Sequence, residues 1–230
     1  GSADGAAYTL DSATTVARKT KIFARVDAIA TVGDTAVVLD RGQTSVTALD
    51  SEGKPQQSLR AGEGATTIAA DPLGRVLVAD TRAGQLLVFG VDPLIERQAY
   101  PVPRAPYGLA GSRSLAWVSQ TAANIVVGYD LATGIPVEKV RYPTVQQPNS
   151  LAFDDSSGTL YVVSGSGAGV QVIRDAAGAR WACSAAGCRR PGRSSSPTST
   201  SGFRCGCRRR SPGSAPPPGS RSRPSTAGGS

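Results

Sequence analysis

Apolar and polar residues alternate over short stretches of this chain, and four of these stretches contain a polar turn. They read "AVVLDRGQTSVTALD", "VLVADTRAGQLLVFG", "AWVSQTAANIVVGYD" and "LYVVSGSGAGVQVIR". The residues that end their leading strands, Asp40, Asp80, Gln120 and Ser164, are 40, 40 and 44 positions apart. Shorter strands such as "TTIAADPLG" and "NSLAFDDSSG" precede these stretches. Two segments that recur at one period predict a repeat architecture.

One repeat unit predicts four strands, at Ile68–Ala70, Arg75–Asp80, Gln85–Gly90 and Glu96–Tyr100. Four strands in about 40 residues is the spacing of a β-propeller blade. Amphipathic helical periodicity is missing throughout. We therefore predict an all-β fold, a partial β-propeller of about four blades that forms an arc of a larger ring. A closed ring of four blades is the alternative.

The ends of the repeated region predict the domain boundaries. "GSADGAAYTLD" aligns with "ADTRAGQLLVFG", so Gly1 falls at the turn between the second and third strands of a blade. The last unit can be followed through its third strand, at about Ile173, after which alternation stops. The predicted propeller segment is 1–175, with half a blade, three full blades and most of another.

The predicted tail, 176–230, carries the basic character of the chain. The net charge is +8, but this tail has ten Arg, no Lys and no acidic residue, which leaves 15 basic and 17 acidic residues in 1–175. Its Arg, Pro, Ser and Gly content predicts disorder. It is also typical of a GC-rich reading frame translated out of phase, and we interpret it as a frameshifted or non-native end. A natural disordered basic tail is the alternative. Specific nucleic-acid binding is not expected.

Metal and cofactor chemistry have little support in the sequence. All four cysteines, Cys183, Cys188, Cys205 and Cys207, lie in the tail, and their spacing does not match paired zinc ligands. The chain has no His, which excludes Ser-His catalysis and His-ligated metals. "ADTRAGQ" lacks the spacing of a phosphate-binding loop, and "DPLG" and "DDSSG" lack that of a calcium loop. We predict no catalytic residue, no metal and no cofactor.

A ligand-binding rim is the one candidate site. Propellers usually bind ligands on the face where the loops into the first strands meet the turns between the second and third strands. In this chain that rim would contain Asp40, Arg41, Asp80, Arg82, Tyr107, Gln120 and Asn149. The recurrence of Asp40 and Asp80 at equivalent positions also suggests a turn-capping role. The alternative hypothesis is therefore that these side chains only satisfy backbone groups of the loops.

Several long stretches resemble a known family. "VLDRGQTSVT", "ADPLGRVLVADTRAGQLLVFGVDPL", "APYGLAGSRSLAWVSQTA" and "GYDLATGIPVEKVRYPTVQQPNSLAFD" are similar to the LppL-type lipoproteins of actinobacteria, propellers of the YncE and NHL kind. The resemblance implies an exported protein of the cell envelope that is held at the membrane by a lipid. No lipid-anchoring cysteine precedes the first blade, so we expect membrane contact only through an anchor outside this sequence.

The sequence thus favours a non-catalytic binding or scaffolding propeller of the cell envelope. Its partner would be a small molecule or an envelope protein. The alternative is a lactonase-like hydrolase or a lyase acting on a small molecule. An enzyme should place several acids or a metal at the channel mouth, whereas a scaffold should present an apolar or aromatic rim.

Overall fold

The computed structural model describes residues 1–10 and 15–176. The chain divides into two compact units, Gly1–Ser184 and Ala185–Ser230. Only the first contains described residues. The predicted disordered tail, apart from Ala176, and its four cysteines lie outside them, so the boundary at residue 175 stays a prediction.

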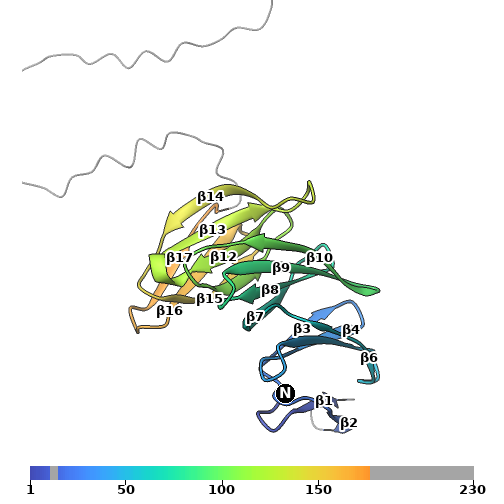
Figure 1. Ribbon diagram of the computed structural model, residues 1–230. Coiled ribbons are helices and arrows are strands. Elements are labelled where there is room, and N and C mark those ends of the chain that lie inside the picture. Colours follow the sequence, from blue (N-terminus) through green and yellow to red (C-terminus); the bar gives the residue numbers. More distant parts are fainter. Residues whose placement is uncertain (11–14, 177–230) are drawn as a thin grey trace, which may run out of the picture. The chain divides into compact units, whose positions relative to one another are not determined.

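The first unit consists of five antiparallel sheets, which we number along the chain (Figure 1). Sheet 1 contains β1 (Ala6–Leu10) and β2 (Val16–Lys21). Sheet 2 contains β3 (Ala28–Val32), β4 (Thr35–Asp40), β5 (Ser45–Leu49) and β6 (Pro55–Arg60). Sheet 3 contains β7 (Ala65–Ala70), β8 (Arg75–Asp80), β9 (Gln85–Val91) and β10 (Leu94–Pro101).

Sheets 4 and 5 continue the pattern. Sheet 4 contains β11 (Pro106–Gly111), β12 (Ala116–Gln120), β13 (Ile125–Asp130) and β14 (Val137–Pro143), with a short 3-10 turn, η1 (Thr121–Ala123), before β13. Sheet 5 contains β15 (Pro148–Asp154), β16 (Thr159–Ser164) and β17 (Val170–Ile173). The four strands predicted within one unit are confirmed in sheet 3, where the first and last extend further than expected.

The first strands of successive sheets, β3, β7, β11 and β15, are neighbours, and the later strands of each sheet follow outward in chain order. This is the blade arrangement of a β-propeller, so the predicted all-β propeller fold is confirmed. No helix in the described part of the chain is long and apolar enough to cross a bilayer.

Each sheet buries residues on both faces because successive side chains of a strand point to opposite sides. We call the side that packs on the following sheet the forward face, and the opposite side the back face. In β8, Leu77 and Ala79 of the forward face pack on sheet 4, whereas Val76 and Val78 of the back face pack on sheet 2. This explains the nearly continuous apolar runs of the middle strands.

The strand register also identifies the strands of sheet 1. A β-bulge interrupts the pairing of the third and fourth strands between Ala48 and Leu49 in sheet 2, and at the matching place in sheets 3 and 4. The pairing of β1 with β2 has the same bulge, between Thr9 and Leu10. Sheet 1 therefore corresponds to the third and fourth strands of a blade.

Candidate functional site

The predicted rim lies on one face of the propeller, which we call the rim face. It holds the loops that lead into the first strands and the turns that join the second and third strands. The seven predicted residues all lie in these loops and turns or at the strand ends beside them. Their side chains fall into three groups that differ in burial and in hydrogen bonding.

Asp40 and Asp80 form the first group, and both are fully buried. The carboxylate of Asp80 accepts N–H bonds from Glu63 at 2.7 Å and Gly64 at 3.1 Å, both in the loop that leads into β7. It accepts a further N–H bond from Ala83 at 2.9 Å, in its own turn. One carboxylate thus ties the loop before a sheet to the turn within it.

Asp40 repeats this arrangement one sheet earlier. Its carboxylate accepts N–H bonds from Ala24 at 2.6 Å and Arg25 at 3.3 Å in the preceding loop, and from Gln43 at 3.1 Å in its own turn. The turn-capping role suggested by the sequence is therefore observed at both aspartates. With these bonds made, little of either carboxylate is left for a ligand.

The hydrogen bonds also set the charge state of Asp80. Burial alone would raise the pKa of its carboxyl, because it disfavours the charged form. The N–H groups of Ala83, Glu63 and Gly64 and the amide of Gln85 outweigh burial and hold the pKa below its usual value. The side chain is therefore an ionised acceptor near neutral pH.

Gln120 lies at the equivalent position in sheet 4. There the preceding loop accepts hydrogen bonds from the turn, whereas in sheets 2 and 3 the loop donates them. Arg104 and Ala105, in the loop before β11, both adopt left-handed backbone conformations, with φ of 66° and 56°. Their carbonyl groups accept N–H bonds from Ala122 and Thr121 in the turn. Since the loop now supplies acceptors, no carboxylate is needed, and the buried Gln120 amide instead donates to the Tyr129 hydroxyl at 3.4 Å.

Sheet 5 follows the second pattern. Gln147 is left-handed, with φ of 49°, and its carbonyl accepts the N–H of Gly165 at 2.7 Å. Ser164, at the aligned position, donates its hydroxyl to the Gln146 carbonyl at 2.6 Å. The aligned side chain thus accepts N–H groups of the preceding loop in sheets 2 and 3, whereas Ser164 donates to that loop and accepts N–H bonds only from Ser166 and Ala168 in its own turn.

Threonine hydroxyls join neighbouring sheets beside these turns. Thr81 donates to the Pro106 carbonyl of sheet 4 at 2.6 Å, and Thr121 donates to the Pro148 carbonyl of sheet 5 at 3.0 Å. The two threonines follow Asp80 and Gln120 directly, so this contact also recurs at the repeat period. The rim face is therefore closed by a regular set of hydrogen bonds between sheets.

Tyr107 and Asn149 form the second group and are half-buried. Each occupies a β-bulge near the start of its first strand: Tyr107 and Gly108 lie opposite Ser119, and Asn149 lies between Pro148 and Ser150. Bulges re-aim side chains and are common beside binding sites. The two bulges are adjacent, since a Cβ on Gly108 would lie 3.0 Å from the Asn149 carbonyl oxygen.

Arg41 and Arg82 form the third group and are exposed at the tips of their turns. Arg104, which the sequence did not single out, is exposed in the adjacent loop. None of the three forms a salt bridge within the described part of the chain, whereas Arg25 pairs with Asp27 at 2.7 Å. The rim face therefore presents free guanidinium groups next to carboxylates that are already occupied.

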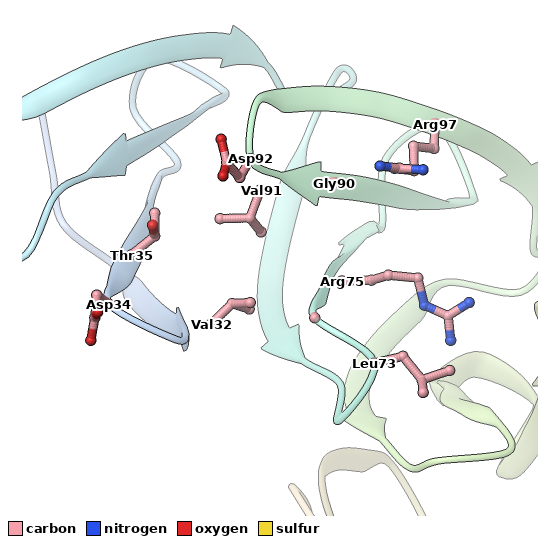
Figure 2. A pocket seen from close by; sticks show the side chains of 10 residues that line it. Val32, Asp34, Thr35, Leu73, Arg75, Gly90, Val91, Asp92 and Arg97 are labelled. Atoms are coloured by element: carbon pink, nitrogen blue, oxygen red, sulfur yellow. The ribbon is translucent and has the colours of Figure 1, made fainter.

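The opposite face contains a hollow that the sequence did not indicate. It lies between sheets 2 and 3 and has a volume of about 520 Å³. Asp34 and Asp92 lie on one side of it, and Arg75 and Arg97 on the other (Figure 2). The lack of a side chain at Gly90 leaves room for Arg97, because a Cβ at residue 90 would lie 2.4 Å from the Arg97 Nε. The lining comes from turns of two different blades, so no short motif could have revealed it.

Arg75 of this hollow is already engaged, with its Nε 2.6 Å from the Asp71 carboxylate. In the residues covered by the structure, no group of three acidic or sulfur side chains is arranged to hold a metal ion. None of the seven predicted rim residues lines the hollow, which makes it separate from the rim face.

Comparison with known proteins identifies the fold. No protein-family model matches the sequence, and no curated protein matches it. Among solved structures, a chain of the mitotic checkpoint complex is similar with a TM-score of 0.67 and 14% identity, over 76% of this chain and 57% of that one. The dihydro-heme d1 dehydrogenase NirN is similar with a TM-score of 0.64 and 18% identity, over 77% and 41%.

Virginiamycin B lyase from Staphylococcus aureus is a third similar structure, with a TM-score of 0.56 and 11% identity over 70% of this chain and 56% of the lyase. The chain spans between 41% and 57% of the length of these three structures. At such identities the likeness establishes a β-propeller fold alone, and these proteins include both enzymes and a component of a protein assembly.

Proposed function

We propose that this chain is a non-catalytic binding or scaffolding propeller whose rim face recognises an anionic ligand. One observation carries the proposal. The carboxylates of Asp40 and Asp80 already accept backbone N–H bonds, whereas the exposed Arg41, Arg82 and Arg104 form no salt bridge within the described residues. Exposed guanidinium groups bind carboxylates and phosphates with paired hydrogen bonds. Tyr107 and Asn149 would add a ring and an amide for orientation.

The bonding of Asp40 and Asp80 argues against a catalytic role for these two carboxylates. A general base needs a free carboxylate that can reach a substrate proton. The carboxylates of Asp40 and Asp80 each already accept three backbone N–H bonds, and the pKa of Asp80 is lowered, which weakens it as a base. A hydrolase or lyase remains the alternative. Steady turnover of any member of a lactone panel by the full chain, followed by acid release, would overturn the non-catalytic proposal.

Amide NMR with pyrophosphate as the probe tests the binding site. We expect pyrophosphate to shift the amide signals of Gly42, Gly64 and Ala83, which lie beside Arg41 and Arg82. The double variant R41Q/R82Q should weaken binding about tenfold or more, as expected for the loss of charged hydrogen bonds. The control R97Q/R113Q removes the same charge from exposed positions away from the rim face. Both double variants leave the arginines of 177–230 unchanged.

Two outcomes would contradict this proposal. Either the control would weaken pyrophosphate binding as much as R41Q/R82Q does, or the shifted signals would lie away from the rim face. In the first case the anion responds to net charge, and in the second it binds another site.

The cellular setting belongs to the same proposal. The stretches that resemble LppL-type lipoproteins support an exported protein of the cell envelope, with a small molecule or an envelope protein as its partner. Fractionation of cells that express the complete gene would test the location. Recovery in the cytosolic fraction would contradict it.

A further inference from the structure

The forward faces of the sheets repeat in register. In sheets 2 to 4 the same four positions of the forward face, two in the second strand and two in the third, are buried. They are Val37, Leu39, Val46 and Ala48 in sheet 2, Leu77, Ala79, Leu86 and Val88 in sheet 3, and Trp117, Ser119, Val126 and Gly128 in sheet 4. Three successive interfaces are thus built from one set of positions.

Sheet 5 has the same four positions, and all of them are exposed. They are Tyr161, Val163, Val170 and Val172, with exposed fractions of 38%, 39%, 58% and 44%. Their pairing is the same as in the earlier sheets, with Val163 opposite Val170 and Tyr161 opposite Val172. A terminal repeat that faces water normally carries polar residues on its outer side. This face instead has the composition of a blade interface.

The back face of sheet 1 is exposed in the complementary way. Tyr8 and Leu10 align with Leu87 and Phe89 of sheet 3, which are buried against the preceding sheet. Tyr8 is 42% exposed and Leu10 is 53% exposed. Val16, opposite Leu10, is exposed as well. The first sheet therefore offers the half of a blade interface that the last sheet lacks.

We infer that two copies of this chain associate head to tail, with the forward face of sheet 5 in one copy packed on the back face of sheet 1 in the other. A forward face packs on a back face in each of the interfaces between sheets 2 and 5. Within residues 1–10 and 15–176 there is one exposed example of each face, and a second copy would supply a partner for both. Each copy spans about half of the similar solved propellers, so the pair has about the extent of one.

Charge favours this pairing over contact between two identical faces. On the back face of sheet 1, Lys19 lies opposite Tyr8, with its Nζ 5.4 Å from the centre of the tyrosine ring. On the forward face of sheet 5, Asp154 lies opposite Thr159, which shares the face of Tyr161. Head-to-tail contact brings opposite charges together, whereas two copies of either face would repel. Such a contact joins unlike surfaces, so it forms a closed ring or an open chain of copies.

The mass of the 230-residue chain, measured against concentration by light scattering, tests the association. Val170→Lys alters the forward face, and Tyr8→Lys alters the back face. Both positions are already exposed, so neither change should affect folding, which circular dichroism checks. We expect each variant to raise the dissociation constant at least about tenfold, because an ammonium would be buried in an apolar contact. The control is Ile135→Lys, at an apolar residue that is 69% exposed between β13 and β14.

Mixing the two variants gives the decisive result. V170K keeps its back face and Y8K keeps its forward face, so an equimolar mixture should form a 1:1 dimer that neither forms alone. A monomeric parent chain at about 100 μM would overturn the inference, since a specific contact should have a micromolar dissociation constant. It would equally fail if I135K dissociated the assembly as strongly, or if the mixture stayed monomeric.

Discussion

Asp80→Asn tests whether the recurring aspartates hold the rim face together. The Oδ2 of Asp80 accepts the N–H of Glu63 and the amide of Gln85, and its Oδ1 accepts the N–H groups of Gly64 and Ala83. Asparagine keeps the shape but supplies one oxygen. Two of the four donors therefore lose their acceptor and face an NH2 group instead.

The magnitude follows from these lost bonds. A buried donor left without a partner costs about 1–3 kcal/mol, so two of them should reduce the free energy of unfolding by about 2–6 kcal/mol. No space is available for a compensating shift toward the loop, because a Cβ on Gly62 would lie only 2.0 Å from Oδ2. With a urea slope of about 2 kcal/mol per molar, the midpoint should fall by about 1–3 M.

The assay is urea unfolding followed by circular dichroism, with Asp50→Asn as the matched control. Asp50 also accepts two backbone N–H bonds and one side-chain amide, from Glu52, Lys54 and Gln56, but in an exposed turn where water can replace it. We expect a much smaller fall for this variant. Equal falls for D80N and D50N would refute the argument, because burial would then not matter.

Three further predictions come from the same contacts. The difference in stability between the parent and D80N should shrink as the pH falls below about 4, because a carboxyl whose folded pKa is lowered stabilises the fold only while it is ionised; a constant difference in urea midpoint down to pH 2.5 would contradict this. Gln120→Asp should reduce the free energy of unfolding by about 2–4 kcal/mol, since its loop offers carbonyl groups rather than N–H donors to a buried carboxylate; unchanged urea unfolding would show that the loop can reverse. Thr81→Val should cost about 1 kcal/mol by removing the bond to the Pro106 carbonyl, and the same midpoint as the parent would contradict that.

The sequence predicts the blades because their physics is local and periodic. Alternation with a period of two specifies the faces of a strand, and the steps between Asp40, Asp80, Gln120 and Ser164 specify the unit. Trp117 lies in a second strand, β12, and is fully buried against sheet 5. Tyr161, at the equivalent position of β16, is exposed because no described sheet follows sheet 5.

The rim could be predicted only in part, because its chemistry depends on backbone conformation. Asp80 has the same sequence context whether its carboxylate faces a ligand or the N–H groups of Glu63 and Gly64. The reversal in sheet 4 depends on positive φ angles at Arg104 and Ala105, which are not glycine and give no sequence signal. Likewise, the sequence does not show which arginines lack an acidic partner, because that depends on where the acidic side chains lie in the fold.

These contacts separate the rim residues into two sets with different expected behaviour. Loop peptide groups and aspartate carboxylates satisfy one another across each blade junction, so the backbone of the rim face has little capacity left for a ligand. Under the proposed function, recognition would come from side chains outside this hydrogen-bonded layer, chiefly Arg41, Arg82 and Tyr107. Substitution of these should change binding and leave the urea midpoint unaltered, whereas substitution of Asp40 or Asp80 should lower the midpoint. A single substitution at the rim that changed both the binding and the urea midpoint would contradict this separation.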